Sequence, residues 1–186
     1  MKKVMILFSS LVLILFSALP VPGQQATKPQ TKLEELFLLK SSLIIKEFYP
    51  IKKKELPDTV SFDWIVVKMA GKEAKPVSGL RVEIIDYSRS ISNKNAVFLD
   101  LEEVKDLIPS IDYMQNLISQ YKNEPPKTYT EVQFSTKGDF KIGFYCEGKE
   151  MKGFMSAGSI SPTSSFFGVE KLAVIKTILE EALKAF

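Results

Sequence analysis

The chain has 186 residues, with 25 basic and 22 acidic side chains, one cysteine and no histidine. Without histidine, the chain has no serine–histidine or cysteine–histidine nucleophile pair, no histidine metal site and no imidazole acid–base group. A single cysteine excludes an internal disulfide, and a nearly balanced charge argues against nucleic acid or an anionic membrane surface as the main partner.

The first 23 residues have the pattern of a secretory signal peptide. Two lysines at residues 2–3 precede an apolar run over residues 4–19, and residues 21–23 supply a cleavage motif. The alternative is a retained membrane anchor, which the short run and the prolines that end it disfavour. Cleavage would leave 23 basic and 22 acidic side chains. Because of the signal peptide, we expect a secreted or periplasmic protein with no stable membrane span.

Residues 24–32 are polar and predict a disordered lead-in, and a first half is predicted over residues 33–124. Within it, apolar spacing indicates a short helix near residues 33–39. The three lysines at 52–54 indicate a solvated loop or a guarded sheet edge, with an anion-binding patch as the alternative. Alternation, β-branched residues and turn signals predict four strands, at residues 43–49 (ending before Pro50), 62–69, 80–87 and 96–99.

An acidic stretch opens the helix predicted over residues 100–122. Asp100 is a suitable N-cap, and Glu103 three residues later completes a capping box. Pro109 lies within the apolar stripe, so we expect a kink there rather than the start of a second segment. Clustered carboxylates could bind calcium or form a glycosidase pair, but we interpret them as the helix start and its solvated face. The acids are Asp100, Glu102, Glu103, Asp106 and Asp112, with Lys105 among them.

A second half is predicted over residues 127–186, after a break at the adjacent prolines 125–126. Its predicted elements are strands at residues 130–135, 140–147, 151–157 and 166–167, and a closing helix at 169–186. An offset of 68 residues aligns Phe98 with Phe166 and carries the apolar stripe of one helix onto the other. The predicted fold is α+β, with curved antiparallel sheets and two helices in a tandem ββββα-ββββα order, the halves sharing one core.

This order of elements resembles the PUR and Whirly class of folds, in which two curved sheets pack together. A second resemblance, to secreted bacterial proteins of unknown function, is carried by three stretches at residues 98–103, 111–114 and 134–143. It implies a secreted or periplasmic domain and no particular activity.

Few other residues carry recognisable chemistry. Cys146 lies on the apolar face of a predicted strand, which indicates a buried structural thiol. Ser119 and Lys122 match Ser-x-x-Lys, but the companion motifs of that enzyme class are missing. Five aromatic residues could offer stacking faces to single-stranded nucleic acid, although aromatic residues at strand spacing more often form a core. They are Trp64, Tyr129, Phe140, Tyr145 and Phe154.

We therefore expect a non-catalytic secreted or periplasmic binding or protein-interaction module. We assign no catalytic, cofactor-binding or metal-binding residue and expect no cofactor. The binding surface is expected on an exposed sheet face or on the loops at residues 88–95 and 158–164. The alternatives are a hydrolase that uses carboxylates alone and a single-stranded nucleic-acid binder on a PUR-like frame.

Overall fold

The computed structural model describes residues 31–51, 56–71, 75–87 and 92–185. The predicted signal peptide, most of the lead-in, the lysines at 52–54 and much of the loop at 88–95 lie outside these residues. The elements are α1 (Lys32–Phe37), β1 (Ile44–Ile51), β2 (Val60–Met69), β3 (Val77–Asp86), β4 (Asn93–Asp100), α2 (Leu101–Asn123), β5 (Thr130–Ser135), β6 (Phe140–Glu147), β7 (Glu150–Ala157), β8 (Thr163–Phe167) and α3 (Lys171–Ala185).

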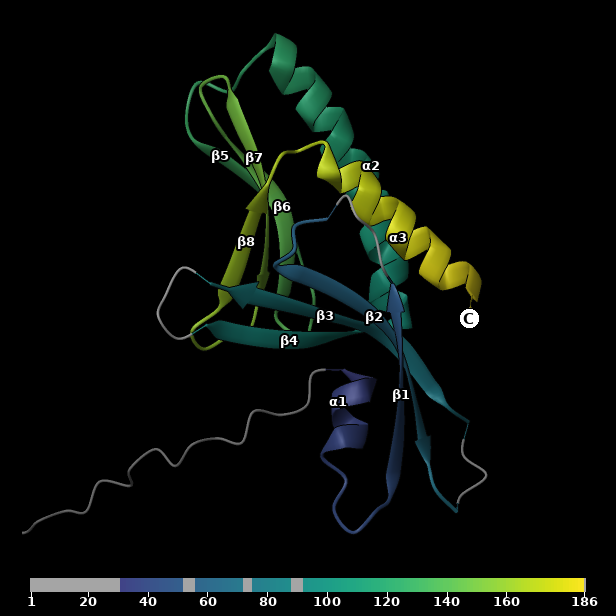
Figure 1. Cartoon of the computed structure of the whole chain (residues 1–186). Helices are drawn as coiled ribbons and strands as arrows, with labels where there is room; N and C mark the ends of the chain where they lie inside the picture. Colours follow the sequence, from purple (N-terminus) through teal and green to yellow (C-terminus); the bar gives the residue numbers. More distant parts are fainter. Residues whose placement is uncertain (1–30, 52–55, 72–74, 88–91, 186) are drawn as a thin grey trace, which may run out of the picture.

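The strands form two four-stranded antiparallel sheets, which confirms the predicted α+β class and the tandem ββββα order. Sheet A has the order β1-β2-β3-β4, and sheet B has the order β5-β6-β7-β8. Each sheet is followed in the chain by a long helix, and α2 and α3 lie side by side along the sheets (Figure 1). Among the described residues, no helix is both long and apolar enough to cross a bilayer.

A single large core joins the two halves. It contains Trp64 and Leu80 from sheet A, Phe144 from sheet B, and Ile111 and Ile175 from α2 and α3, all with at most 1% of their surface exposed. These residues alternate along the strands or recur at helical spacing, so each element turns one apolar face inward. Burial of these faces is the main force that holds the halves together.

The edge strand β8 also contacts sheet A through polar groups. The hydroxyls of Thr59 and Ser165 share a hydrogen bond of 2.9 Å, and the Asn95 side-chain amide donates to the Thr163 hydroxyl at 2.9 Å. These contacts explain why β4 and β8 begin earlier than predicted, at Asn93 and Thr163. The prediction relied on apolar alternation. These strand ends instead carry polar side chains whose hydrogen-bond partners lie in the other half of the chain.

Three further features differ from the predictions, besides shifts of one to three residues at the ends of β2, β3, β7, α2 and α3. Strand β1 continues through Pro50 to Ile51, which an edge strand tolerates because one side of it needs no ladder hydrogen bonds. Helix α1 begins at Lys32, within the predicted lead-in, and its N-cap Thr31 forms a capping box with Glu34. Helix α2 is one helix across Pro109, so the alternative of a second segment is wrong.

Helix α1 covers part of the outer face of sheet A. Leu33 is fully buried there against Ile65 and Val67, and the ring of Phe37 packs edge-on against Phe98 at 4.8 Å. The helix can approach so closely because residue 79 is glycine. A Cβ atom at that position would lie 2.2 Å from the carbonyl oxygen of Leu99 and 2.7 Å from Leu33 Cδ1.

Candidate functional site

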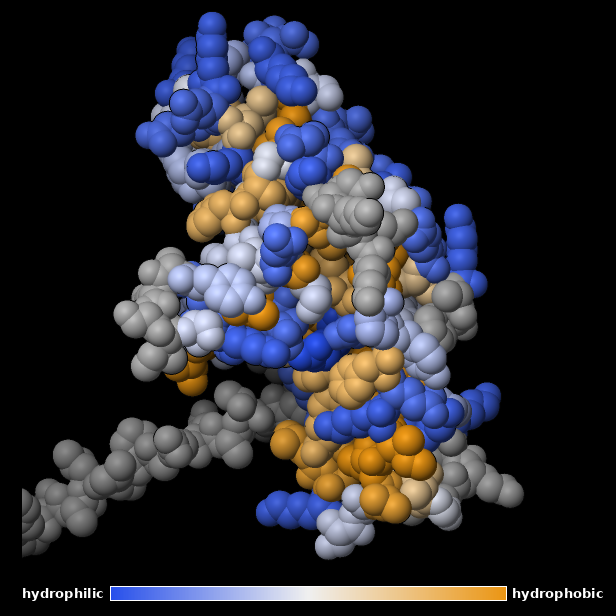
Figure 2. Space-filling view, in the orientation of Figure 1, coloured by the Kyte–Doolittle hydropathy of each residue, from blue (hydrophilic) through white to orange (hydrophobic). Residues whose placement is uncertain are grey.

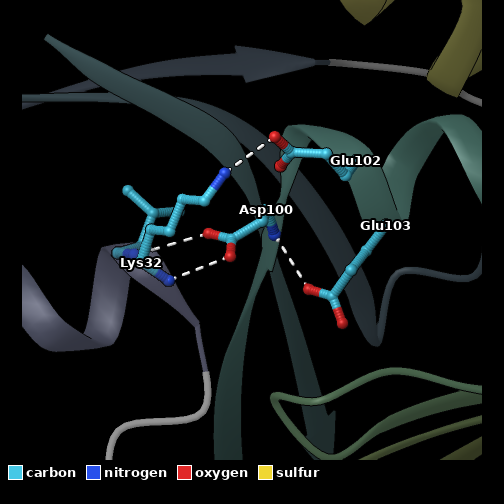
Figure 3. A network of polar contacts seen from close by, with 5 residues as sticks. Lys32, Asp100, Glu102 and Glu103 are labelled. Carbon is cyan, nitrogen blue, oxygen red and sulfur yellow. Dashed lines mark hydrogen bonds and ion pairs between the residues drawn. The ribbon is translucent and has the colours of Figure 1, made fainter.

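The acidic stretch at the start of α2 connects helix α1 to the junction between β4 and α2 (Figure 3). The Asp100 carboxylate accepts hydrogen bonds from the backbone N–H groups of Lys32, at 2.9 Å, and Leu33, at 3.4 Å. The Glu103 carboxylate accepts from the Asp100 amide at 3.0 Å, as the predicted capping box requires. Asp100 thus ends β4, caps α2 and holds the first turn of α1.

Glu103 and Asp112 make similar connections. Glu103 also accepts from the Lys137 amide at 2.6 Å, which attaches the β5–β6 hairpin to the start of α2. Asp112 pairs with Lys176 at 2.6 Å and links α2 to α3. Among the described residues, no group of three or more Cys, Asp or Glu side chains is arranged to hold a metal ion. The contacts support the interpretation of these acids as structural.

One ion pair at this junction changes the pKa of both partners. Lys32 Nζ lies 2.7 Å from Glu102 Oε1. Their hydrogen bond raises the pKa of Lys32 and lowers the pKa of Glu102. Both side chains are more than half exposed, so water and salt screen the pair and its contribution to stability is small.

The nucleophile candidates occupy structural positions. The Ser119 hydroxyl donates to the Gln115 carbonyl at 3.0 Å, a hydrogen bond within helix α2. Cys146 is fully buried, as predicted, and its thiol donates to the Gly148 carbonyl at 3.4 Å. A fully buried thiol packs as a small apolar side chain, which is the structural role that the sequence indicates.

The five aromatic candidates separate into two groups. Trp64 and Phe140 belong to the core. Tyr129, Tyr145 and Phe154 lie on the outer face of sheet B, together with Phe166, which is not among the predicted candidates. We call these four residues the aromatic face: Tyr129, Tyr145, Phe154 and Phe166. The sequence holds a signal for this face, because the alternation along β6 places Tyr145 on the side of the strand that faces away from the core.

The rings of the aromatic face contact one another. Tyr129 and Tyr145 are stacked with centroids 5.9 Å apart, and Tyr145 meets Phe166 edge-on at 6.4 Å. Tyr129 is 57% exposed and Phe166 58% exposed, whereas Phe154 is 9% exposed. Two large rings of this face, Tyr129 and Phe166, are therefore more than half exposed.

One end of the aromatic face is negative. The Tyr129 hydroxyl donates to Glu131 at 3.0 Å. The pKa of Tyr129 is raised, first by this hydrogen bond, then by partial burial, and further by the nearby charges of Glu131 and Glu147. Two carboxylates therefore stand beside a pair of stacked rings, a combination that favours a cation.

Removal of Glu131 should make Tyr129 easier to ionise. In Glu131→Ala we expect the pKa of Tyr129 to fall toward its ordinary value, because the acceptor that favours the neutral phenol is lost. NMR titration of tyrosine ring carbons measures this shift. Glu47→Ala is the matched control, since Glu47 accepts from Tyr49 in the same way at 3.1 Å. The control should shift Tyr49 alone, and an unchanged Tyr129 in Glu131→Ala would contradict the geometry.

Cross-strand pairing shows what occupies the equivalent place on sheet A. Phe98 lies opposite Arg81, which lies opposite Asp63. In sheet B, Phe166 lies opposite Phe154, which lies opposite Gly143. When Phe98 is matched to Phe166 by the 68-residue offset, Asp63 therefore matches Gly143.

The same alignment places helix α1 over the equivalent of the aromatic face. Ile65 lies two residues after Asp63, and Tyr145 lies two residues after Gly143, so Ile65 matches Tyr145. Ile65 is buried beneath α1, whereas Tyr145 is half-buried and, in the part of the chain that the structure describes, no helix lies over it. The aromatic face is thus the part of sheet B that corresponds to the α1-covered part of sheet A.

A groove of about 410 Å³ lies between α2 and the edge strand β5. Three consecutive residues of β5, 132–134, line the groove. Successive side chains of a strand point to opposite faces. The groove therefore follows the open edge of β5 rather than one face of it. Its lining carries no charged side chain and consists of Pro109, Ser110, Tyr113, Met114, Val132, Gln133 and Phe134.

Exposed aliphatic residues gather elsewhere, around α1 and β1, where Figure 2 shows an apolar region in the lower part of the molecule. Leu38, Leu43 and Ile45 are between 46% and 72% exposed. Rings of this region already lie beside cations of the chain, since Lys46 Nζ is 3.7 Å from the Phe37 centroid and the Arg81 guanidinium is 5.7 Å from the Phe48 centroid.

The fold and the surface together define a tandem ββββα protein with an exposed aromatic sheet face. No family model, curated protein or solved structure matches the chain.

Proposed function

We propose that this chain is a non-catalytic protein-interaction module and that the aromatic face of sheet B is its binding surface. The observation that supports the proposal is the difference between the two outer sheet faces. On sheet A the chain covers the apolar patch with its own helix, and on sheet B, within the described residues, the rings of Tyr129 and Phe166 remain more than half exposed. Large exposed aromatic rings are the side chains that contribute most to protein interfaces.

The distribution of charge favours a protein partner over nucleic acid. The outward positions of β6 and β7 carry Lys141 and Lys152 but also Glu147 and Glu150, and Glu131 adds a third acid on β5. A phosphate backbone needs a surface that is positive throughout. The proposed location, secreted or periplasmic, follows from the signal-like N-terminus, and the partner would then be met outside the cytoplasm.

The proposal is tested by removing the exposed rings. The purified protein and the double variant Tyr145→Ser/Phe166→Ser would each be immobilised and exposed to the secreted and periplasmic proteins of the source cells. We expect a partner that is retained by the unchanged protein and lost from the double variant. Leu43→Ser is the control, because Leu43 is 72% exposed but lies outside the aromatic face and outside the loop at residues 158–164. Equal retention by the double variant would show the proposal to be wrong.

A further inference from the structure

We propose that the open edge of β5 binds an extended segment of a partner protein, which pairs antiparallel with β5 and carries apolar side chains at alternate positions. These side chains would enter the groove between α2 and β5. The site is separate from the aromatic face, which lies on the outer face of sheet B, so the inference does not depend on the proposed function.

One side of β5 has backbone groups that no strand of the described chain uses. The Thr136 amide donates to the Phe140 carbonyl at 2.9 Å, so this is a hydrogen-bonded pair. Such pairs alternate along an antiparallel ladder, and the register therefore makes the even-numbered residues of β5 the ones that bond to β6. The N–H and C=O groups of Glu131, Gln133 and Ser135 point the other way, where sheet B ends.

The other sheet edges are protected in ways that β5 is not. Strands β4 and β8 lie against the opposite half of the chain, as the hydrogen bond between Asn95 and Thr163 shows. Strand β1 carries Lys46 and Pro50, and both residue types on an edge discourage the addition of a further strand. Strand β5 has the sequence Thr-Glu-Val-Gln-Phe-Ser, which contains neither. Its edge can therefore accept another strand.

The groove determines which side chains an added strand would carry. Residues directly opposite each other in an antiparallel pair point to the same face. Val132 and Phe134 are half-buried against the core, so the partner residues opposite them would point into the groove. The groove has a volume of about 410 Å³, and its uncharged lining includes Pro109, Tyr113 and Met114. It favours large apolar side chains at these two positions.

The outward positions of the segment differ in charge. The residue opposite Glu131 would lie beside an exposed carboxylate, and opposite charges attract across a pair of strands. Gln133 and Ser135 are uncharged and make no such demand. From the residue opposite Ser135 to the residue opposite Glu131, the segment therefore has the pattern polar, apolar, polar, apolar, lysine.

Neither a second copy of the chain nor its own lead-in fits this place. Two copies paired through β5 would have their core-facing sides on the same side of the joint sheet. The second copy would then bring its own α2 beside the first, where the groove has room for a few side chains and not for a helix. Residues 24–30 are polar apart from one alanine and one proline, so they lack the apolar alternation.

The test uses designed peptides as the probe. A short capped peptide would have Thr-Leu-Thr-Ile-Lys at its centre, and its control would have the same composition as Thr-Thr-Leu-Ile-Lys. Binding to the purified protein would be measured by calorimetry, and the contact surface by NMR amide shifts. We expect the control to bind about tenfold more weakly, because one of its two apolar side chains would then point away from the groove.

Methylation of the peptide backbone separates strand pairing from simple apolar contact. The amide of the central threonine, opposite Gln133, would point at β5, so its methylation should abolish binding. The amide of the isoleucine would point away from β5. Its methylation is the matched control and should change the affinity by no more than about twofold.

Three protein variants locate the site. Tyr113→Ser removes part of the groove wall and should weaken binding about tenfold. Tyr87→Ser is its control, because both tyrosines are 63% exposed and Tyr87 lies outside the groove. Gln133→Pro removes an outward N–H group that the ladder with β6 does not use. It should abolish binding while circular dichroism stays unchanged, and Phe166→Ser should leave binding unchanged.

Five results would overturn the inference. They are no binding of either peptide, equal affinity for the two, binding that survives methylation of the central threonine, binding unaffected by Tyr113→Ser, and binding lost in Phe166→Ser. The last result would place the peptide on the aromatic face instead. Sedimentation that shows a dimer dissolved by Gln133→Pro would replace the partner segment with a second copy of the chain. If Gln133→Pro fails to fold, Tyr113→Ser still decides whether the groove is the site.

Discussion

Replacement of Asp100 by alanine should lower the free energy of unfolding by about 3 kcal/mol. Asp100 is 5% exposed, and its carboxylate accepts from two backbone N–H groups of α1. Without it, these donors lose a charged acceptor, and α2 loses its N-cap residue. Urea unfolding followed by the fluorescence of Trp64, the only tryptophan in the chain, measures the change.

The matched control for this substitution is Asp106→Ala. Asp106 belongs to the same acidic stretch, but its side chain is exposed on α2, so its loss should change stability by no more than about 0.5 kcal/mol. Asp100→Asn should fall between the two, since the amide oxygen can still accept a hydrogen bond without the charge. If Asp100→Ala cost as little as the control, the junction would not hold α1 in solution.

The fold could be predicted where one face of an element is apolar and the other polar. Strands β5 and β6 have the predicted bounds, 130–135 and 140–147, because their residues alternate strictly and a turn separates them. Strand β8 was predicted only at residues 166–167. Its buried polar residues, Thr163 and Ser165, make their hydrogen bonds to the other half of the chain, and local alternation carries no information about such distant partners.

The acidic stretch shows a similar limit. Its capping role could be predicted, because a capping box involves residues only three apart. The second role of Asp100, as an acceptor for the amides of α1, joins residues 68 positions apart, and this depends on where α1 packs. The repeat likewise predicted the order of elements, but it could not show that, among the described residues, a helix covers the outer face of sheet A and none covers that of sheet B.

The contrast between the two outer faces leads to the second large effect. Leu33→Ala should lower the free energy of unfolding by about 3 kcal/mol, because it opens a cavity under α1 at a fully buried leucine. Phe166→Ala removes a larger side chain, but its ring is 58% exposed. We expect that substitution to cost no more than about 0.5 kcal/mol. Urea unfolding of both variants on the same day gives the comparison directly.

The two measurements together separate a structural ring from a binding ring. Phe98 and Phe166 hold the same position in the two halves, and only Phe98 is covered by α1. A small cost for Phe166→Ala, beside a large cost for Leu33→Ala, means that the fold does not need the exposed ring, so its place on the surface is available for a partner. A cost for Phe166→Ala close to that of Leu33→Ala would mean that the ring stabilises sheet B, and the case for the aromatic face as a binding surface would fail.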